Sequence, residues 1–343
     1  MMFYQLIIEI LSNYECSWYE MLQGFKKKEL EALIMEVLPP NSEGDYSNFS
    51  FATIFVVFLL TVLSLWYLEV PSLMGNSTFQ FHSNIIPVEL LALFRTACFL
   101  LSAYTIVILM VRSTDPGTMI ALRHKENDYH LFELLGLERL VSFSSWTLMI
   151  FGTAFLFASI GTWHSVFDIE VPDWITIFSS VLYSIALGCV FLTSTVVRYI
   201  IIPTEIKMER DFDHLFKTHE SIMHNVAIIL IVIDMIVTKP NLQPEFGLFG
   251  IIIGIIYLTF AYLWAFFGGG YYIYTFIDPR MKSSPQVLIG LAFSIGLFYL
   301  GVWIISKIMD EVFLLGVLII VLWVSQITMF KKPDAAKKIE LIS

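Results

Sequence analysis

Long apolar stretches recur along almost the whole chain, and they restrict the possible folds more than any other feature. Each stretch approaches the roughly 20 residues that a helix needs to cross a hydrocarbon core of about 30 Å. The stretches are residues 51–67, 88–111, 142–163, 174–197, 221–238, 246–274, 287–305 and 312–330. In lipid, such segments must satisfy their own backbone hydrogen bonds, as a helix does. The sequence therefore predicts an all-α polytopic transmembrane helix bundle with about eight spans.

The balance of residue types excludes several other classes of protein. Hydrophobic residues make up 57% of the chain and charged residues 15%, whereas soluble domains have about 45–50% and 25%. The net charge is −10 and the sequence shows no basic stripe, so nucleic acid is not an expected partner. Cys16, Cys98 and Cys189 have neither metal-ligand nor redox spacing. We therefore expect no disulfide framework, no zinc site and no cofactor.

Lysine and arginine are distributed unevenly between the loops, which predicts the orientation in the membrane. With a cytoplasmic N-terminus, 17 of the 20 Lys and Arg residues lie in the N-terminal segment, the inner loops and the C-terminal tail. Only Lys239 and Lys307 fall in outer loops, and Arg95 lies within the second span. Because translocation discriminates against these residues in short loops, we expect both termini to be cytoplasmic. The last two stretches, separated only by residues 306–311, are expected to form a tight helical hairpin.

The regions outside the central spans have features of their own. Residues 1–50 are expected to be a cytosolic N-terminal segment. We expect no cleavable signal in its first 40 residues, because acidic residues interrupt the apolar run from Met2 to Leu11 and three lysines follow it. Apolar positions from Trp18 to Leu38 recur at helical spacing, which indicates an amphipathic helix on the membrane or on the bundle. Residues 51–87 supply a first span and an outer loop in which Asn76 begins an N-glycosylation sequon. The membrane core is expected in residues 88–308, and the last span with a basic tail in 309–343.

Ionisable residues within spans cost about 2.5–3.5 kcal/mol on insertion scales and mark functional sites by default. His224 and Asp234 lie in the fifth span, about 15 Å apart along a helix, which is too far for a direct hydrogen bond. Asp234 is either a second polar group of the same cavity or a fastener to another helix. His224 is either an imidazole satisfied by a neighbouring helix or a functional base. Arg95 is either structural or extends toward the outer interface.

A metal site is not expected from the histidine spacing. His214, His219 and His224 recur every five residues, whereas the zinc-protease helix motif places its two histidines four residues apart. Five residues separate two side chains by about 140° around a helix, so they do not share a face.

A hydroxyl-rich run, residues 142–147, opens the third span at its cytosolic boundary. It is either an ordinary helix cap or the source of a reactive hydroxyl. The third and fifth spans both begin on the cytosolic side, so Ser144 and His224 are expected at the same depth. A hydroxyl beside an imidazole is the usual pairing of nucleophile and base.

The sixth span ends in three glycines followed by Tyr271, Tyr272 and Tyr274. Gly268–Gly270 permit a helix break or a close approach between helices. The tyrosines suit an aromatic belt at the interface, and the alternative is that this segment lines the same cytosolic-leaflet cavity.

Three segments together carry a family resemblance. They are Phe143-Ser144-Ser145-Trp146 at the start of a span, His224 with Asp234 ten residues later, and Gly-Gly-Gly-Tyr-Tyr-Ile-Tyr-Thr-Phe-Ile-Asp-Pro, which ends at Pro279. In this order, over residues 91–305, the chain resembles the rolling stone and androgen-induced membrane protein superfamily.

The androgen-induced branch implies a multi-pass hydrolase of fatty acid esters of hydroxy fatty acids, with a threonine nucleophile and a histidine. By position, Ser144 stands for the threonine and His224 is the histidine, and serine keeps the hydroxyl chemistry. The chain departs from the family pattern at Ser145, where Asn is usual, and at Thr275, where Pro is usual. It also has Ala227 where rolling-stone-like relatives have Asn. The rolling stone branch implies a developmental role with no established chemistry.

The leading functional hypothesis is a membrane-embedded lipid-ester hydrolase with Ser144 as nucleophile and His224 as base. Its pocket or supporting residues are Ser145, Trp146, Asp234, Tyr271, Tyr272, Tyr274 and Asp278. The alternative is a non-catalytic membrane protein, either an accessory subunit of a membrane complex or an adhesion or fusion factor. It would dock through the N-terminal helix and the extra spans. A transporter or channel using His224, Asp234 and Arg95 is third, and membrane lipids are expected partners in each case.

Overall fold

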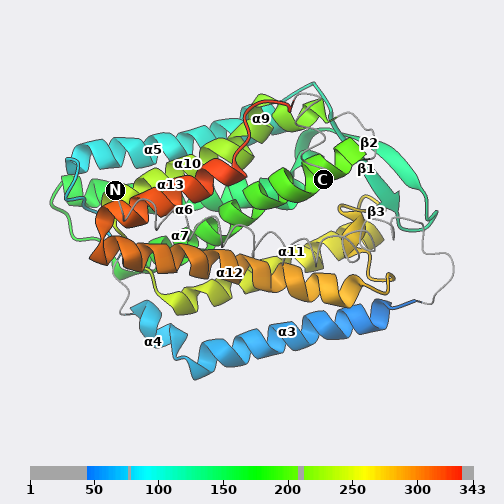
Figure 1. Cartoon of the computed structure of the whole chain (residues 1–343), viewed down its shortest axis with the longest axis horizontal. Coiled ribbons are helices and arrows are strands. Elements are labelled where there is room, and N and C mark those ends of the chain that lie inside the picture. The colour runs from blue at the N-terminus through cyan, green and yellow to red at the C-terminus, as the bar shows by residue number, and fades with distance from the viewer. Residues whose placement is uncertain (1–44, 76–78, 208–211, 334–343) are drawn as a thin grey trace, which may run out of the picture.

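The computed structural model describes residues 45–75, 79–207 and 212–333, and within them the chain forms an all-α bundle of long antiparallel helices (Figure 1). Seven helices in these ranges are long and apolar enough to cross a membrane, so the chain is an integral multi-pass membrane protein. The seven are Ser47–Tyr67, Val88–Val111, Phe143–Val166, Asp173–Lys207, Thr218–Thr238, Pro244–Phe267 and Ser284–Glu311.

Several of these spans are composed of more than one kind of helix. Their long α-helical parts are α3 (Ser47–Tyr67), α5 (Val88–Tyr104), α6 (Phe143–Val166), α7 (Asp173–Val196), α10 (Ala227–Thr238), α11 (Gly247–Phe267) and α12 (Ser284–Glu311). Shorter helices extend them: α8 (Ile202–Lys207) follows α7, α9 (Thr218–Ser221) precedes α10, and the 3-10 turn η6 (Pro244–Phe246) precedes α11.

The eighth expected span corresponds to α13 (Phe313–Ile327), a helix of 15 residues. It is shorter than the roughly 20 residues of a full crossing. The backbone breaks at Val312, and α13 folds back along α12. The Gly316 Cα passes close to Met309, because a Cβ built at this glycine would lie 2.7 Å from the Met309 nitrogen. The expected tight hairpin is therefore present, with a shorter second arm.

A small sheet marks one end of the bundle, which we call the sheet end. Strands β1 (Gly117–Arg123), β2 (Tyr129–Leu134) and β3 (Tyr271–Tyr272) pair antiparallel in the order β2-β1-β3. No strands were expected from the sequence, and the sixth apolar stretch was expected to continue as a helix to residue 274. The helix instead ends at Phe267, because Gly268–Gly270 turn the chain, and Gly270 has a φ of +75°. Tyr271 and Tyr272 then join the sheet.

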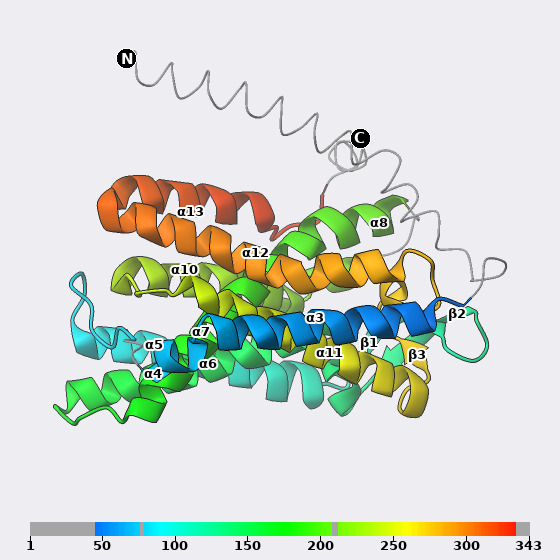
Figure 2. The same ribbon diagram turned by 90° about the horizontal axis from the view of Figure 1, so that it is seen from below.

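The first and last described segments lie at the sheet end. Tyr46 N–H donates to the Arg280 carbonyl, 3.2 Å away, and Met329 N–H donates to Asn225 Oδ1 at 2.8 Å. The opposite end carries α4 (Val70–Gly75) and the loop before α5, which buries Phe79 and Phe81 (Figure 2). The glycosylation sequon at Asn76 and the amphipathic segment from Trp18 to Leu38 lie outside the described residues.

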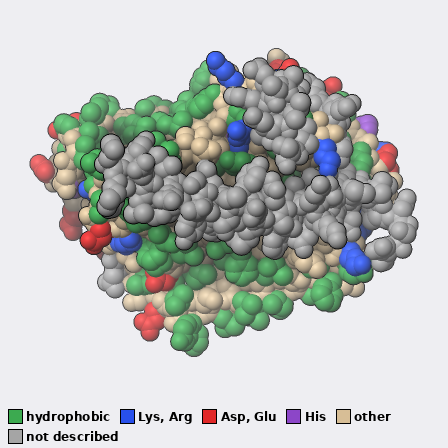
Figure 3. Space-filling view, in the orientation of Figure 1, with side chains coloured by type: hydrophobic (Ala, Val, Ile, Leu, Met, Phe, Trp, Pro, Cys, Tyr) green, Lys and Arg blue, Asp and Glu red, His purple; other side chains and the backbone are tan. Residues whose placement is uncertain are grey.

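The outer surface of the bundle is apolar along the helices. Helix α3 lies at the periphery, packed against α11 and α12, and exposes Phe49, Phe55 and Trp66 to more than 60% each. Figure 3 shows hydrophobic side chains in a row over α3, along the lower edge of that view. A helix with so little buried surface needs lipid around it, which agrees with its position as the first span.

Helices α7, α11 and α12 approach one another most closely around Ile295. A Cβ built at Gly188 would lie 2.8 Å from the Ile295 carbonyl oxygen, and one at Gly250 would lie 2.6 Å from Ile295 Cγ2. Gly254 faces the same side chain at 3.1 Å. Small residues let transmembrane helices pack backbone against backbone. This junction therefore sets the spacing between the three helices near Ile295.

We predict that Gly188→Ala lowers the free energy of unfolding by about 1–3 kcal/mol, because the added methyl group meets the α12 backbone rather than a flexible side chain. Gly290→Ala on α12 is the matched control, since a Cβ there has open space around it. Thermal unfolding in detergent compares the two. Equal stability of both variants would contradict the close approach at Ile295.

Candidate functional site

Three π-helical turns interrupt the described helices, and all three lie toward the sheet end. They are η1 (Thr105–Val111) after α5, η3 (Val197–Ile201) after α7 and η5 (Ile222–Val226) before α10. A π turn inserts into the normal helical ladder and is frequently found at functional sites. Side chains satisfy carbonyls at two of these turns: Arg139 Nη1 donates to Leu109 and Met110, and Ser194 Oγ donates to His224.

His224 belongs to a chain of four buried or half-buried polar side chains, which we call the His224 cluster: Arg139, His219, Glu220 and His224. His224 Nε2 lies 3.1 Å from Glu220 Oε2, and the His219 Nε2 atom lies 3.5 Å from Glu220 Oε1. Arg139 Nη2 lies 3.0 Å from His219 Nε2. Arg139 is 6% exposed and His224 4%. The cluster therefore joins the turn before α6 to the start of the fifth span.

An ion pair outside the spans lies next to the His224 cluster. Lys217 Nζ, just before α9, lies 2.6 Å from Asp115 Oδ2. The hydrogen bond from Lys217 lowers the pKa of the Asp115 carboxyl, so this aspartate stays charged at neutral pH. Asp115 also accepts a hydrogen bond from Arg139 through its backbone carbonyl at 3.3 Å. The loop between the second and third spans is thus tied to the start of the fifth.

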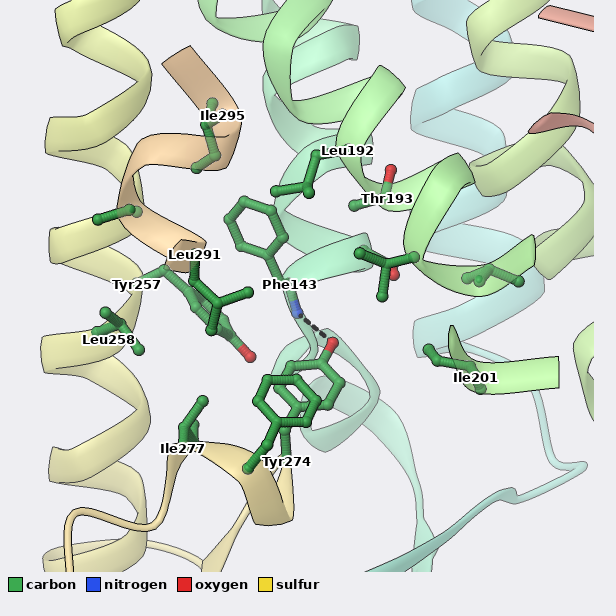
Figure 4. A pocket seen from close by; sticks show the side chains of 16 residues that line it. Phe143, Leu192, Thr193, Ile201, Tyr257, Leu258, Tyr274, Ile277, Leu291 and Ile295 are labelled. Atoms are coloured by element: carbon green, nitrogen blue, oxygen red, sulfur yellow. Dashed lines mark hydrogen bonds between the residues drawn. The ribbon is translucent and has the colours of Figure 1, made fainter. Parts of the chain in front are cut away.

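An apolar cavity of about 640 Å³, its mouth included, opens beside α6 at the sheet end (Figure 4). Its walls come from the start of α6, the ends of α7 and η3, α11, the 3-10 turn η7 (Thr275–Ile277) and α12. Ile295 and Leu192 bound the cavity near the close contact of α7 and α12. The cavity lies on the sheet-end side of this junction.

Four hydroxyl groups interrupt the apolar wall, from Ser144, Thr193, Tyr257 and Tyr274. Two are bound to nearby carbonyls: Thr193 Oγ1 donates to Cys189 at 3.0 Å and Tyr257 OH donates to Val141 at 3.1 Å. Tyr274 OH accepts from the Phe143 N–H at 3.1 Å, the bond drawn in Figure 4, and Ser144 is the next residue along the chain and also lines the cavity. Ser144 and Tyr274 therefore form one polar spot on the cavity wall.

The Tyr274 phenol remains protonated at neutral pH. Burial raises the pKa of Tyr274 to about 12, and the negative charge of Glu220 also acts to raise it. A protonated phenol donates a hydrogen bond to a carbonyl or an oxyanion.

Ser144 and His224 lie at the same end of the molecule, but they are not directly bonded. Ser144 lines the cavity, whereas His224 does not. Among the described residues, no hydrogen bond joins the two side chains, and His224 Nδ1 has no partner at all. Segments α6 and η5 are nevertheless in contact. The hydroxyl thus faces the cavity, and the imidazole sits in the polar cluster beside it.

Two of the other residues expected around the pocket, Ser145 and Trp146, lie near the start of α6. Ser145 is fully buried and bonds the Arg139 carbonyl at 2.9 Å, so it shapes the turn before α6. Trp146 packs edge-on against Tyr257, behind the cavity wall. Neither residue lines the cavity.

The segment after β3 is held by a separate network. Asp278 is fully buried and pairs with Arg280, with a 2.7 Å contact from Nη2 to Oδ2. Arg280 Nη1 donates to the His124 carbonyl at 3.0 Å, and its guanidinium lies over the Tyr272 ring. Tyr271 packs against Phe132 of β2. These residues clamp η7 to the sheet, so they support the cavity floor without lining it.

Arg95 and Asp234 form a fully buried ion pair in the opposite half of the bundle. Arg95 Nε lies 2.8 Å from Asp234 Oδ1, and Nη2 lies 3.1 Å from Oδ2. Arg95 Nη1 also bonds Thr162 Oγ1 and the Gln80 carbonyl. Arg95 therefore does not extend to the outer interface, and Asp234 fastens α10 to α5 and α6. Within the described residues, neither connects to the His224 cluster by a hydrogen bond.

Sequence reasoning did not identify Arg139, Glu220 or Tyr257 as site residues. Glu220 precedes His224 by four residues, a spacing that places two side chains on one helix face, and this signal was present in the sequence. No such signal pointed to Arg139, because its role depends on backbone carbonyls in the π turn η1. Among the described residues, no three His, Cys, Asp or Glu side chains are grouped so that they could hold a metal ion.

In comparisons with known proteins, no family model matches the sequence, and no curated protein or solved structure matches it either.

The buried ion pair yields a prediction about stability. Arg95→Met and Asp234→Leu each leave one charged partner unpaired in the core, so each lowers the free energy of unfolding by about 3–5 kcal/mol. The double variant Arg95→Met/Asp234→Leu removes both charges and is expected to lose less than the sum of the two single changes. Thermal unfolding of the three variants measures this coupling. Additive losses would mean that the two side chains do not interact.

Proposed function

We propose that this protein binds the acyl chain of a membrane lipid in the cavity at its sheet end. The carrying observation is a cavity of about 640 Å³ with apolar walls and one polar spot, formed by Ser144 and Tyr274. Sites for small organic molecules typically combine apolar walls with a few placed polar groups. An acyl chain fits the walls, and its carbonyl fits the hydroxyl pair.

The charge of the lining restricts the ligand further. Within the described part of the chain, no Lys, Arg, Asp or Glu side chain lines the cavity. Burying an unpaired charge is costly, so the portion of the ligand inside the cavity is neutral. A charged head group, where the lipid has one, would lie outside the mouth.

Hydrolysis of an acyl ester is a second candidate function, favoured by the pairing of His224 with Glu220. An imidazole bound to a carboxylate through one nitrogen, with its other nitrogen unpartnered, is arranged as a general base. In this proposal Ser144 Oγ attacks the ester carbonyl carbon while His224 takes the serine proton. The proton then passes to the leaving alkoxide as the ester C–O bond breaks. Water cleaves the acyl-serine ester by the same route and releases the fatty acid.

This chemistry requires a proton transfer from Ser144 to His224, although no hydrogen bond joins the two side chains in the structure. Catalytic hydrogen bonds are often long until substrate is bound, and the contact between α6 and η5 keeps the two residues on adjacent elements. Tyr274 would donate to the carbonyl oxygen as negative charge develops there. Lipid binding without hydrolysis requires only the cavity, so an assay of turnover separates the two candidates.

We predict that a photoreactive long-chain fatty-acyl ester crosslinks to the cavity wall of the protein in nanodiscs. Ala292→Phe places a ring in the cavity and should reduce crosslinking at least about tenfold. Gly290→Phe is the matched control, because it lies on the same helix but is exposed to the outside. Mass spectrometry locates the crosslinks. Labelling spread evenly over the lipid-facing helices, or unaffected by Ala292→Phe, would refute acyl binding in the cavity.

For hydrolysis, we predict that purified protein in nanodiscs cleaves long-chain fatty-acyl esters. Ser144→Ala and His224→Ala should each lower turnover by about 100-fold or more, because each removes a group that takes part in proton transfer or attack. Ser165→Ala on the same helix and His214→Ala are the controls. Absence of turnover in the wild type, or turnover insensitive to both site variants, would leave lipid binding as the function.

A further inference from the structure

One buried nitrogen of the His224 cluster lacks a partner within the described residues. His224 is 4% exposed, its Nε2 lies 3.1 Å from Glu220 Oε2, and its Nδ1 has no hydrogen-bond partner. Most buried polar atoms in proteins are paired, and each exception calls for a reason. Which of the two nitrogens carries the proton decides whether Nδ1 is a donor or a base.

The neighbouring contacts determine the position of this proton. A guanidinium group has only donors and stays charged, so Arg139 Nη2 donates to His219 Nε2 across 3.0 Å. His219 Nε2 is then an acceptor, which makes His219 neutral, with its proton on Nδ1. The 3.5 Å contact between His219 Nε2 and Glu220 Oε1 therefore carries no hydrogen bond.

Glu220 accepts its hydrogen bond from the other histidine, His224. Glu220 Oε2 lies 3.1 Å from His224 Nε2, and a charged carboxylate is an acceptor only. His224 Nε2 thus carries a proton, and in the neutral ring Nδ1 has a free lone pair.

We propose that Glu220 is a positioning residue that holds His224 as its Nε2–H tautomer, so that Nδ1 is the proton-accepting atom of the site. This inference rests on the proposed hydrolysis for the use of that base, but the tautomer itself does not depend on hydrolysis. The arrangement is that of a carboxylate that holds an imidazole in its working tautomer. Here the carboxylate takes Nε2, and the base is the nitrogen nearer the main chain.

The backbone around His224 supports this orientation. Ser194 Oγ donates to the His224 carbonyl at 2.6 Å, and Asn225 exchanges two hydrogen bonds of 2.8 Å with the backbone of Met329. The π turn η5 is thereby held on both sides, by α7 and by the segment after α13. With its backbone fixed, the His224 ring is held chiefly by its bond to Glu220.

Nuclear magnetic resonance of protein labelled with ¹⁵N-histidine, in nanodiscs at neutral pH, tests the proposal directly. The His224 signals are assigned by their loss in His224→Ala. We expect Nε2 to carry the proton and Nδ1 to be bare in the wild type. A proton on Nδ1 in the neutral wild-type ring overturns the proposal, whatever the variants show.

Two variants test the role of Glu220. Glu220→Ala should convert His224 to a mixture of both tautomers and lower kcat at least about tenfold, with little change in KM, because the cavity that binds the acyl chain is intact. Glu133→Ala, on the exposed side of β2, should change neither. An unchanged His224 tautomer in a folded Glu220→Ala protein overturns the positioning role. Wild type that shows the expected tautomer but no turnover supports the positioning of His224 and removes the hydrolysis.

Discussion

A segment within lipid must find partners for its backbone hydrogen-bonding groups inside the protein, and the sheet end of this molecule depends on that constraint. The turns η1 and η5 present carbonyls that side chains satisfy, and the donors are Arg139 and Ser194. Arg139 satisfies η1 with one amino group and contacts His219 with another. Arg139 therefore both satisfies backbone carbonyls and determines which ring nitrogen of His219 accepts a hydrogen bond.

The cavity has a similarly simple origin. Three glycines bring α7, α11 and α12 together around Ile295, and η3 continues α7 from there toward the sheet end. Space opens where the helices separate, and η7 lies beneath it. The Arg280 network ties η7 to β1 and β3 through His124 and Tyr272. The cavity walls are therefore formed by elements that the fold itself holds in place.

Much of the fold could be predicted from the sequence, because the length of an apolar stretch determines whether it crosses a bilayer. The apolar stretches and the hairpin at Val312 follow from that rule. The strands could not be predicted this way, since β1 and β2 lie in a polar loop and β3 is two residues long, defined only by its pairing with β1.

The depth of the candidate site in the membrane could be predicted from the sequence, but the contacts of its residues could not. Topology placed Ser144 and His224 at one end of the bundle, as the structure has them. The partner of His224 is Glu220 and the partner of Asp234 is Arg95. The first pair follows local helix spacing, whereas the second joins residues 139 positions apart, a contact that only the packed bundle reveals.

The ionisable groups at the two ends of the bundle differ in their exposure to water. Arg95 and Asp234, at the end opposite the sheet, are fully buried, and Arg95 lies under Phe79. The His224 cluster begins at the other end, beside the partly exposed Asp115 and Lys217. Water at the sheet end can therefore reach residues bonded to the His224 cluster, whereas the Arg95–Asp234 pair is closed off from water.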